Sequence, residues 1–138
     1  MRIVKWPHDP EHVAQENGND YTYFRLAEMH LIKAEAMNEL GNTAGAVAEV
    51  NILRARVFNP PKPLSAGDFN QASFRTQILR ERLFELTAEA KRRQDLIRHG
   101  QFTAARSFKP QTQPFRILMP IPQSQLDTNP LLQQNPGY

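Results

Sequence analysis

The stretch AEAMNELGNTAGAVAEVNIL, residues 34–53, holds two short helical patterns on either side of Gly41 and Asn42. A glycine followed by an asparagine at the end of an apolar repeat is typical of a left-handed helix C-cap. We therefore expect one helix to end at Leu40 and another to begin at about Ala44. Two helices joined by so short a link fold back on each other as an antiparallel hairpin.

The helical pattern extends outward from this link in both directions. The first helix is expected over residues 21–40, with Asp20 as N-cap, because its carboxylate can accept hydrogen bonds from the unpaired amides of the first turn. Its apolar positions are Leu26, Met29, Ala36, Met37 and Leu40. The second helix is expected over residues 44–57. Its apolar positions are Ala46, Val47, Val50, Leu53 and Val57.

A third helix is expected after the proline-rich loop at residues 59–63, since proline fixes φ and lacks an amide donor. Asp68 and Gln71 have capping-box spacing, and residues 69–98 contain neither glycine nor proline. The sequence thus predicts one long helix over residues 68–99, ended by Gly100. The face expected to be buried carries Ile78, Leu79, Leu83, Leu86 and Ala90.

The last segment, residues 100–138, carries six of the eleven prolines, so regular structure is expected only in short pieces near residues 115–119 and 124–127. It is nevertheless rich in large apolar side chains, which are unusual in a solvated linker. These are Leu118, Met119, Ile121, Leu126, Leu131 and Leu132. We therefore expect this tail to pack back across the helices.

The hairpin, over residues 20–58, resembles one tetratricopeptide-type unit, because the small residues Ala34 and Ala46 let two helices approach closely around the turn at Gly41. The predicted fold is therefore mainly α. It consists of this helical hairpin, one long helix and an irregular proline-rich C-terminal tail packed across them. The 138 residues suit a single domain spanning residues 1–138, and a short strand is expected at Ile3 to Trp6.

Composition excludes several classes of function. The net charge of +3 is small and its charges are mixed along the chain, so nucleic-acid binding is not expected. The chain has no cysteine, which excludes disulfides, thiolate zinc sites and a cysteine nucleophile. The first residues contain no apolar run, so neither a signal peptide nor a transmembrane span is expected in this sequence.

A charged run over residues 80–98 offers the richest possible chemistry. Glu81, Glu85 and Glu89 recur every four residues and share a helix face, so Glu85 and Glu89 could serve as the two carboxylates of a glycosidase. Arginines at three- and four-residue separations favour structural ion pairs instead, since nearby cations lower a carboxyl pKa. The expected pairs join Glu85 to Arg82, Glu89 to Arg92 and Arg93, and Asp95 to Arg92 and Arg98. No catalytic residue is therefore assigned.

Histidines and aromatic side chains are the remaining candidates for a site. His8 and His12 have metal-ligand spacing on a helix, but Pro7 and Pro10 disfavour that helix, so no metal site is assigned. His30 and His99 are interpreted as polar surface groups or as groups that make a single hydrogen bond. The aromatic side chains near the start of the chain could stack on sugars, although packing is favoured for such large side chains. They are Trp6, Tyr21, Tyr23 and Phe24.

Several motifs together resemble the C-terminal region of the SusD/RagB family of outer-membrane nutrient-binding lipoproteins. They are FRLAE at residues 24–28 leading into AEA at 34–36, NILRAR at 51–56, ILRER at 78–82 with Glu85, Leu86 and Glu89, Arg92 with DLIR at 95–98, and PIP at 120–122 with NP at 129–130 and QNPGY at 134–138. Two positions depart from the family pattern. Ala90 stands where the family usually has glycine, and Arg93 where it usually has an aromatic residue.

The resemblance implies capture of oligosaccharides or other nutrients at the cell surface, without catalysis or a cofactor. The implied partner is a SusC-like TonB-dependent outer-membrane transporter. Family members also carry a lipobox cysteine and further helical repeats, so this sequence is expected to be a C-terminal fragment whose glycan-contacting residues lie largely elsewhere. Ligand-binding residues therefore stay unknown. The alternative is a small tetratricopeptide-like adaptor that binds a peptide or protein partner.

Overall fold

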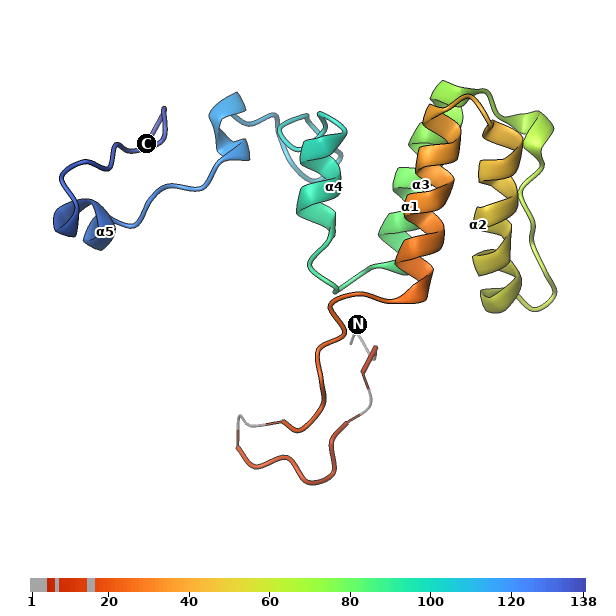
Figure 1. Ribbon diagram of the computed structural model, residues 1–138, viewed down its shortest axis with the longest axis horizontal. Helices are drawn as coiled ribbons and strands as arrows, with labels where there is room; N and C mark the ends of the chain where they lie inside the picture. The colour runs from red at the N-terminus through yellow and green to blue at the C-terminus, as the bar shows by residue number, and fades with distance from the viewer. Residues whose placement is uncertain (1–4, 7, 15–16) are drawn as a thin grey trace. The chain divides into compact units, whose positions relative to one another are not determined.

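The computed structural model describes residues 5–6, 8–14 and 17–138. These residues form five α-helices and two short 3-10 helices, and this described part contains no strand of a sheet. The predicted mainly α fold is thus confirmed (Figure 1). Ile3 and Val4 of the predicted strand lie outside the described residues, whereas Lys5 and Trp6 are irregular. Contacts divide the chain into two compact units, residues 1–92 and 93–138, so the single domain stays a prediction.

The first unit is built on a helical hairpin, α1 (Leu26–Glu39) and α2 (Thr43–Val57), which lie side by side in Figure 1. Gly41 between them has φ +84°, in the left-handed region that glycine adopts at no steric cost. The amide of Asn42 donates to the carbonyl of Met37 at 2.9 Å, and its side chain accepts from the amide of Gly45 at 2.9 Å. The predicted C-cap is confirmed, and Asn42 also caps the second helix.

A third helix, α3 (Gln71–Glu85), packs against both members of the hairpin and closes the core. Ala34 and Ala46 are fully buried, as expected for small residues at a close helix contact. Phe74 of α3 is also fully buried and lies edge to face with Phe69, with ring centroids 5.2 Å apart. The core residues are Ala27, Leu31, Ala34, Ala46, Val47, Val50, Leu53, Phe74, Ile78 and Leu86.

The first helix differs from its prediction in both start and face. It begins at Leu26 because Arg25 is extended, with φ −148° and ψ 158°, so Asp20 is not its N-cap. Its buried stripe runs through Leu31 and Asn38, whereas the predicted core residue Leu40 is 86% exposed. Asn38 tolerates burial because its amide donates to the carbonyl of Gln71 at 2.9 Å and its oxygen accepts from Thr43 at 2.9 Å.

The prediction of one continuous helix over residues 68–99 is wrong. Helix α3 is capped by Asn70 and Ser73 instead of Asp68 and Gln71, and it ends at Glu85; α4 (Arg92–Arg98) begins only after an irregular turn. Within that turn Ala88 and Ala90 have φ +67° and +58°. Residues of this turn form hydrogen bonds with distant parts of the chain. These bonds compensate for the helical hydrogen bonds that the turn lacks.

Replacing Ala90 with glycine is expected to stabilise the protein by about 1 kcal/mol, because a Cβ atom is strained in the left-handed region. The same change at Ala48, an exposed residue inside α2, is expected to destabilise it by roughly the same amount. Urea unfolding of the two variants would measure both effects. Equal destabilisation by the two glycines would contradict the left-handed assignment.

The second unit, residues 93–138, contains α4, a 3-10 helix at Pro114–Ile117 and α5 (Gln123–Thr128). The two short pieces predicted for the tail are thus confirmed. The chain end folds back within this unit: Gln134 and Ile121 exchange two hydrogen bonds of 2.8 and 3.0 Å, and the Tyr138 hydroxyl donates to the carbonyl of Leu118 at 2.9 Å. Gly137, with φ +95°, lies against the Phe115 ring, where a Cβ atom would clash.

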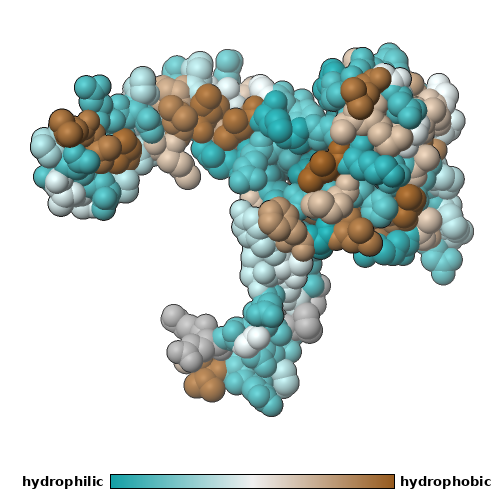
Figure 2. Space-filling model, in the orientation of Figure 1, coloured by the Kyte–Doolittle hydropathy of each residue, from teal (hydrophilic) through white to brown (hydrophobic). Residues whose placement is uncertain are grey.

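Large apolar side chains remain on the surface of the second unit, where Figure 2 shows brown patches. Phe108 is 83% exposed and Leu131 is 90% exposed, although both are large and apolar. Only Asp95 and Leu96 of this unit are fully buried among the described residues. The packing of the tail across the helices stays a prediction.

Candidate functional site

The charged residues at the end of α3 form a cluster around Arg25. Its guanidinium donates from Nε to both carboxylate oxygens of Glu89, at 2.8 and 3.0 Å. The same group donates from Nη1 to the Glu85 carboxylate and from Nη2 to the Glu85 carbonyl, each at 2.5 Å. Because Glu89 is only 3% exposed, Arg25 neutralises a carboxylate that has lost most of its water.

Two further cations complete this Arg25 cluster, which comprises Lys5, Arg25, Arg56, Glu85 and Glu89. Lys5 forms an ion pair with Glu89 and donates to the carbonyls of Glu85 and Thr87, at 2.7 and 3.0 Å. Arg56 of α2 donates to the Glu85 carboxylate at 2.7 Å. The cluster therefore ties the N-terminal segment, the start of α1, the end of α2 and the turn after α3 to one another.

The predicted ion pairing is confirmed, but the predicted partners of Glu85 and Glu89 are wrong. Glu85 and Glu89 bind cations that lie far away in the sequence. For Glu89, the turn at residues 86–91 removes the helical register that Arg92 and Arg93 would need. The basic residues predicted for them bind elsewhere: Arg82 pairs with Glu28 at 3.6 Å, Arg92 donates to the carbonyl of Leu79 at 2.9 Å, and Arg93 donates to that of Ile117 at 2.8 Å. The pair Asp95–Arg98, at 3.2 Å, is as predicted.

The electrostatics of Glu89 do not suit a general acid. Burial raises the pKa of its carboxyl group, but the hydrogen bonds and charges of Arg25 and Lys5 outweigh burial and bring the pKa below its usual 4.5. A glycosidase general acid needs a raised pKa to hold its proton at neutral pH. Glu85 and Glu89 also share the Arg25 guanidinium, so the space between them is filled by a cation.

Acidification is expected to destabilise the first unit. Glu49 forms an ion pair with Lys33, and its carboxylate lies 2.9 Å from Nδ1 of His30. The pKa of Glu49 is also below 4.5, mainly because of the hydrogen bond from Lys33. A folded-state pKa below the unfolded value gives stability that is present above about pH 4.5 and is lost as the pH falls further. Urea unfolding at pH 7 and pH 3.5 would measure this loss, and Glu89→Gln should reduce it. An unfolding free energy that is equal at both pH values would contradict the expectation.

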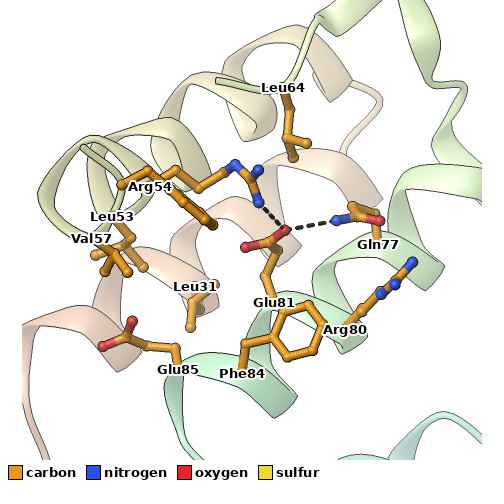
Figure 3. A pocket seen from close by; sticks show the side chains of 11 residues that line it. Leu31, Leu53, Arg54, Val57, Leu64, Gln77, Arg80, Glu81, Phe84 and Glu85 are labelled. Carbon is orange, nitrogen blue, oxygen red and sulfur yellow. Dashed lines mark hydrogen bonds and ion pairs between the residues drawn. The ribbon is translucent and has the colours of Figure 1, made fainter. Parts of the chain in front are cut away.

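A pocket of about 390 Å³ lies between α2, α3 and the loop that joins them (Figure 3). Its walls are largely apolar, and on its polar side the Glu81 carboxylate accepts hydrogen bonds from Arg54 at 2.8 Å and from Gln77 at 2.7 Å. The pocket can hold an apolar group beside a neutralised carboxylate. Its lining is Leu31, Leu53, Arg54, Val57, Phe58, Leu64, Gln77, Arg80, Glu81, Phe84 and Glu85.

The histidines do not assemble a metal site in the described part of the chain. The rings of His8 and His12 meet edge to face with centroids 4.6 Å apart, and His12 Nδ1 lies 3.1 Å from the carbonyl of Asp9. Across residues 5–6, 8–14 and 17–138, no three histidine or carboxylate side chains come close enough together to hold an ion. His30 binds Glu49, so it serves as a structural partner.

The aromatic residues near the start of the chain are more exposed than expected. Tyr21, Tyr23 and Phe24 are 51%, 61% and 67% exposed, so the prediction that they pack in the core is wrong for these three. Lys91 forms cation–π contacts with Tyr23 and Phe24, and its Nζ lies 4.5 and 4.7 Å from their ring centroids. Tyr21 instead stacks on Trp6.

Comparison with known proteins identifies the family of this architecture. The family model described as "SusD family" matches residues 1–138, the whole chain. The chain belongs to the SusD family. The resemblance seen in the motifs is thereby confirmed.

Curated relatives within the SusD family are similar along most of the chain. SusD-like protein P25 of Formosa agariphila is 35% identical over 96% of this chain, and the starch-binding protein SusD of Bacteroides thetaiotaomicron is 29% identical over all of it. These alignments cover 28% and 26% of the two relatives, so the chain spans about a quarter of their length. Among the described residues, no helix has both the length and the apolar character needed to cross a bilayer.

Proposed function

We propose that this chain is a scaffold region of a SusD-family protein that binds oligosaccharides at the bacterial cell surface for nutrient uptake. The match of the SusD family model to all 138 residues carries the proposal. The similarity to a protein named as starch-binding supports glycan as the class of ligand. In this proposal α1, α2 and α3 supply rigidity, since their charged groups bind one another and are not available for chemistry.

The proposed protein acts without catalysis and together with a TonB-dependent outer-membrane transporter. The lowered pKa of Glu89 supports a binding role, because it leaves the most buried glutamate of the charged run ionised at neutral pH. Anchoring as an outer-membrane lipoprotein belongs to the same proposal. The transporter, the lipid anchor and the ligand are all inferred from membership of the family.

The alternative, a peptide-binding adaptor, has one feature in its favour. The pocket beside Phe84 has apolar walls with Arg54 and Arg80 among its lining, which suits an apolar side chain next to an acidic one (Figure 3). The family match favours glycan uptake over this alternative.

Polysaccharide binding by the protein expressed from its complete reading frame tests the proposal. Affinity electrophoresis in gels that contain starch, laminarin, xylan or polygalacturonate should show retardation by at least one polymer. A reducing-sugar assay on the same polymers should show no hydrolysis. A tagged copy expressed with a TonB-dependent transporter from the same organism should co-purify with that transporter. Absence of retardation in every gel by a folded protein, or hydrolysis abolished by Glu85→Gln, would contradict the proposal.

A further inference from the structure

A small open hollow in the N-terminal segment, before α1, combines two aromatic rings with three polar side chains. Its volume is about 310 Å³, and its lining is Trp6, Asn17, Asn19, Asp20 and Tyr21. The rings of Trp6 and Tyr21 are stacked, with centroids 5.9 Å apart and planes 29° apart. Since Tyr21 is 51% exposed, the pair forms an aromatic platform that solvent can reach.

The loop that carries the polar residues is organised by its own hydrogen bonds. The carboxylate of Asp9 accepts from the amide of Gly18 at 2.8 Å and from the amide of Glu11 at 2.9 Å. Next to it, the side-chain oxygen of Asn17 accepts from the amide of Asn19 at 2.8 Å. These contacts hold the Asn17 and Asn19 backbone beside the platform before any ligand arrives, which lowers the entropy cost of binding.

This combination matches the surface of a sugar. A pyranose ring has a face of C–H groups, which packs on an aromatic ring, and an edge of hydroxyl groups, which donate to and accept from amides and carboxylates. Asn17 and Asn19 offer both donors and acceptors, and Asp20 offers acceptors. Of the five described residues that line it only Asp20 carries a charge, so this described lining offers no cation to an acidic group.

We propose that Trp6, Tyr21 and the side chains of Asn17, Asn19 and Asp20 form a binding site for a neutral saccharide. The inference rests on the proposed glycan-binding function and adds to it a site within this chain and a class of ligand. The nearby Tyr23–Phe24 pair is no second platform. Its rings meet at 83° and are occupied by Lys91, so no extended aromatic surface is available there.

Trp6 makes the proposal directly measurable, because it is the single tryptophan of the chain. A sugar that stacks on the platform must change the fluorescence of this indole. The 138-residue chain is titrated with maltoheptaose, laminariheptaose and xylohexaose as neutral probes and with polygalacturonate oligomers as an acidic probe. We expect saturable quenching or a blue shift with at least one neutral probe and a weaker response to the acidic probe.

Substitutions of the second ring separate stacking from nonspecific effects and leave the reporter in place. Tyr21→Ala is expected to weaken binding by about tenfold or more, as for the loss of one stacking ring. Tyr21→Phe keeps the ring and should stay within about threefold of the unchanged chain. Tyr23→Ala is the matched control, since Tyr23 is a neighbouring exposed tyrosine outside the hollow, and it should bind like the unchanged chain. Circular dichroism checks that each variant keeps its helices.

Three results would overturn the site: no fluorescence response to any neutral probe, an equal or stronger response to the acidic probe, or equal losses from Tyr21→Ala and Tyr23→Ala. The full-length protein distinguishes failure of the site from failure of the proposed function. If full-length protein is retarded by a polysaccharide while the isolated chain shows no response, the site is wrong and the function stands. If neither binds any saccharide, the proposed function fails as well.

Discussion

Replacing Arg25 with methionine is expected to lower the free energy of unfolding by about 3 kcal/mol. The change removes the Arg25 Nε donor from the carboxylate of Glu89, which is 3% exposed and then keeps only Lys5, and it removes one of the two donors to the carbonyl of Glu85. Breaking a buried pair from one side is costly because the remaining charge stays desolvated. The Arg25 side chain is itself 22% exposed, so water partly compensates for the loss. The expected value is therefore at the low end of the roughly 3–5 kcal/mol that breaking a buried ion pair costs. Urea unfolding monitored by circular dichroism measures it.

The matched control for this prediction is Arg75→Met. Arg75 also binds a glutamate, Glu39, through two nitrogens, but both side chains are more than 40% exposed. Water screens this pair, so its loss should hardly change the stability. A double variant, Arg25→Met with Glu89→Gln, should lose less than the sum of the two single changes, because both remove one interaction. Equal effects of Arg25→Met and Arg75→Met would contradict the bracing role of Arg25.

Replacing Phe74 with alanine is expected to lower the free energy of unfolding by about 3–5 kcal/mol. Phe74 is fully buried within the cluster that α3 forms with the hairpin, and it packs against Phe69. The change removes apolar contacts and leaves a cavity between three helices that cannot all collapse into it. Thermal and urea unfolding would measure the loss.

A smaller change and an exposed phenylalanine serve as controls for the core. Phe74→Leu should cost less than Phe74→Ala, so it gives a value even where the alanine variant fails to fold. Phe84→Ala should cost less than about 1 kcal/mol, because Phe84 is 60% exposed. If Phe84→Ala is as damaging as Phe74→Ala, the assignment of the core to the contact of α3 with the hairpin is wrong.

The hairpin could be predicted from the sequence because local signals specify it. Gly41 ends α1 through its left-handed conformation, and Asn42 caps α2 with its side chain. Ala34 and Ala46 identify the close contact of the two helices by their small size. The short pieces at residues 114–117 and 123–128 were likewise predictable, since the surrounding prolines leave little room for longer helices.

The break after α3 could not be predicted because its causes are not local. Nothing between Leu86 and Lys91 is a helix breaker, and Ala88 and Ala90 favour helix by propensity. The turn forms because it brings Glu89 to Arg25 and places Lys91 where it donates to the carbonyl of Tyr23 at 2.8 Å. The resemblance described above implies glycine at position 90, and the φ of +58° there lies in the left-handed region that glycine adopts most readily.

The ion-pair partners of Glu85 and Glu89 could not be predicted from the sequence either. Helical spacing pointed to arginines within four residues, whereas Arg25 lies 60 and 64 residues away from Glu85 and Glu89. Lys5 and Arg56 lie 80 and 29 residues from Glu85, and their sequence spacing gives no sign that they converge on it. For the proposed saccharide site, only the aromatic residues could be named from the sequence. Its polar lining depends on the loop at residues 17–20, whose position follows from tertiary structure.

Glu89, in the turn after α3, is held ionised at neutral pH by Arg25 and Lys5 and braces the fold. Carbon-detected NMR titration of the Glu89 carboxyl group in the intact chain tests this role most directly. We expect the titration midpoint of the Glu89 carboxyl group to lie below the usual 4.5, since Arg25 and Lys5 stabilise its charged form. A midpoint well above 4.5 would show an unneutralised buried acid and would contradict the bracing role.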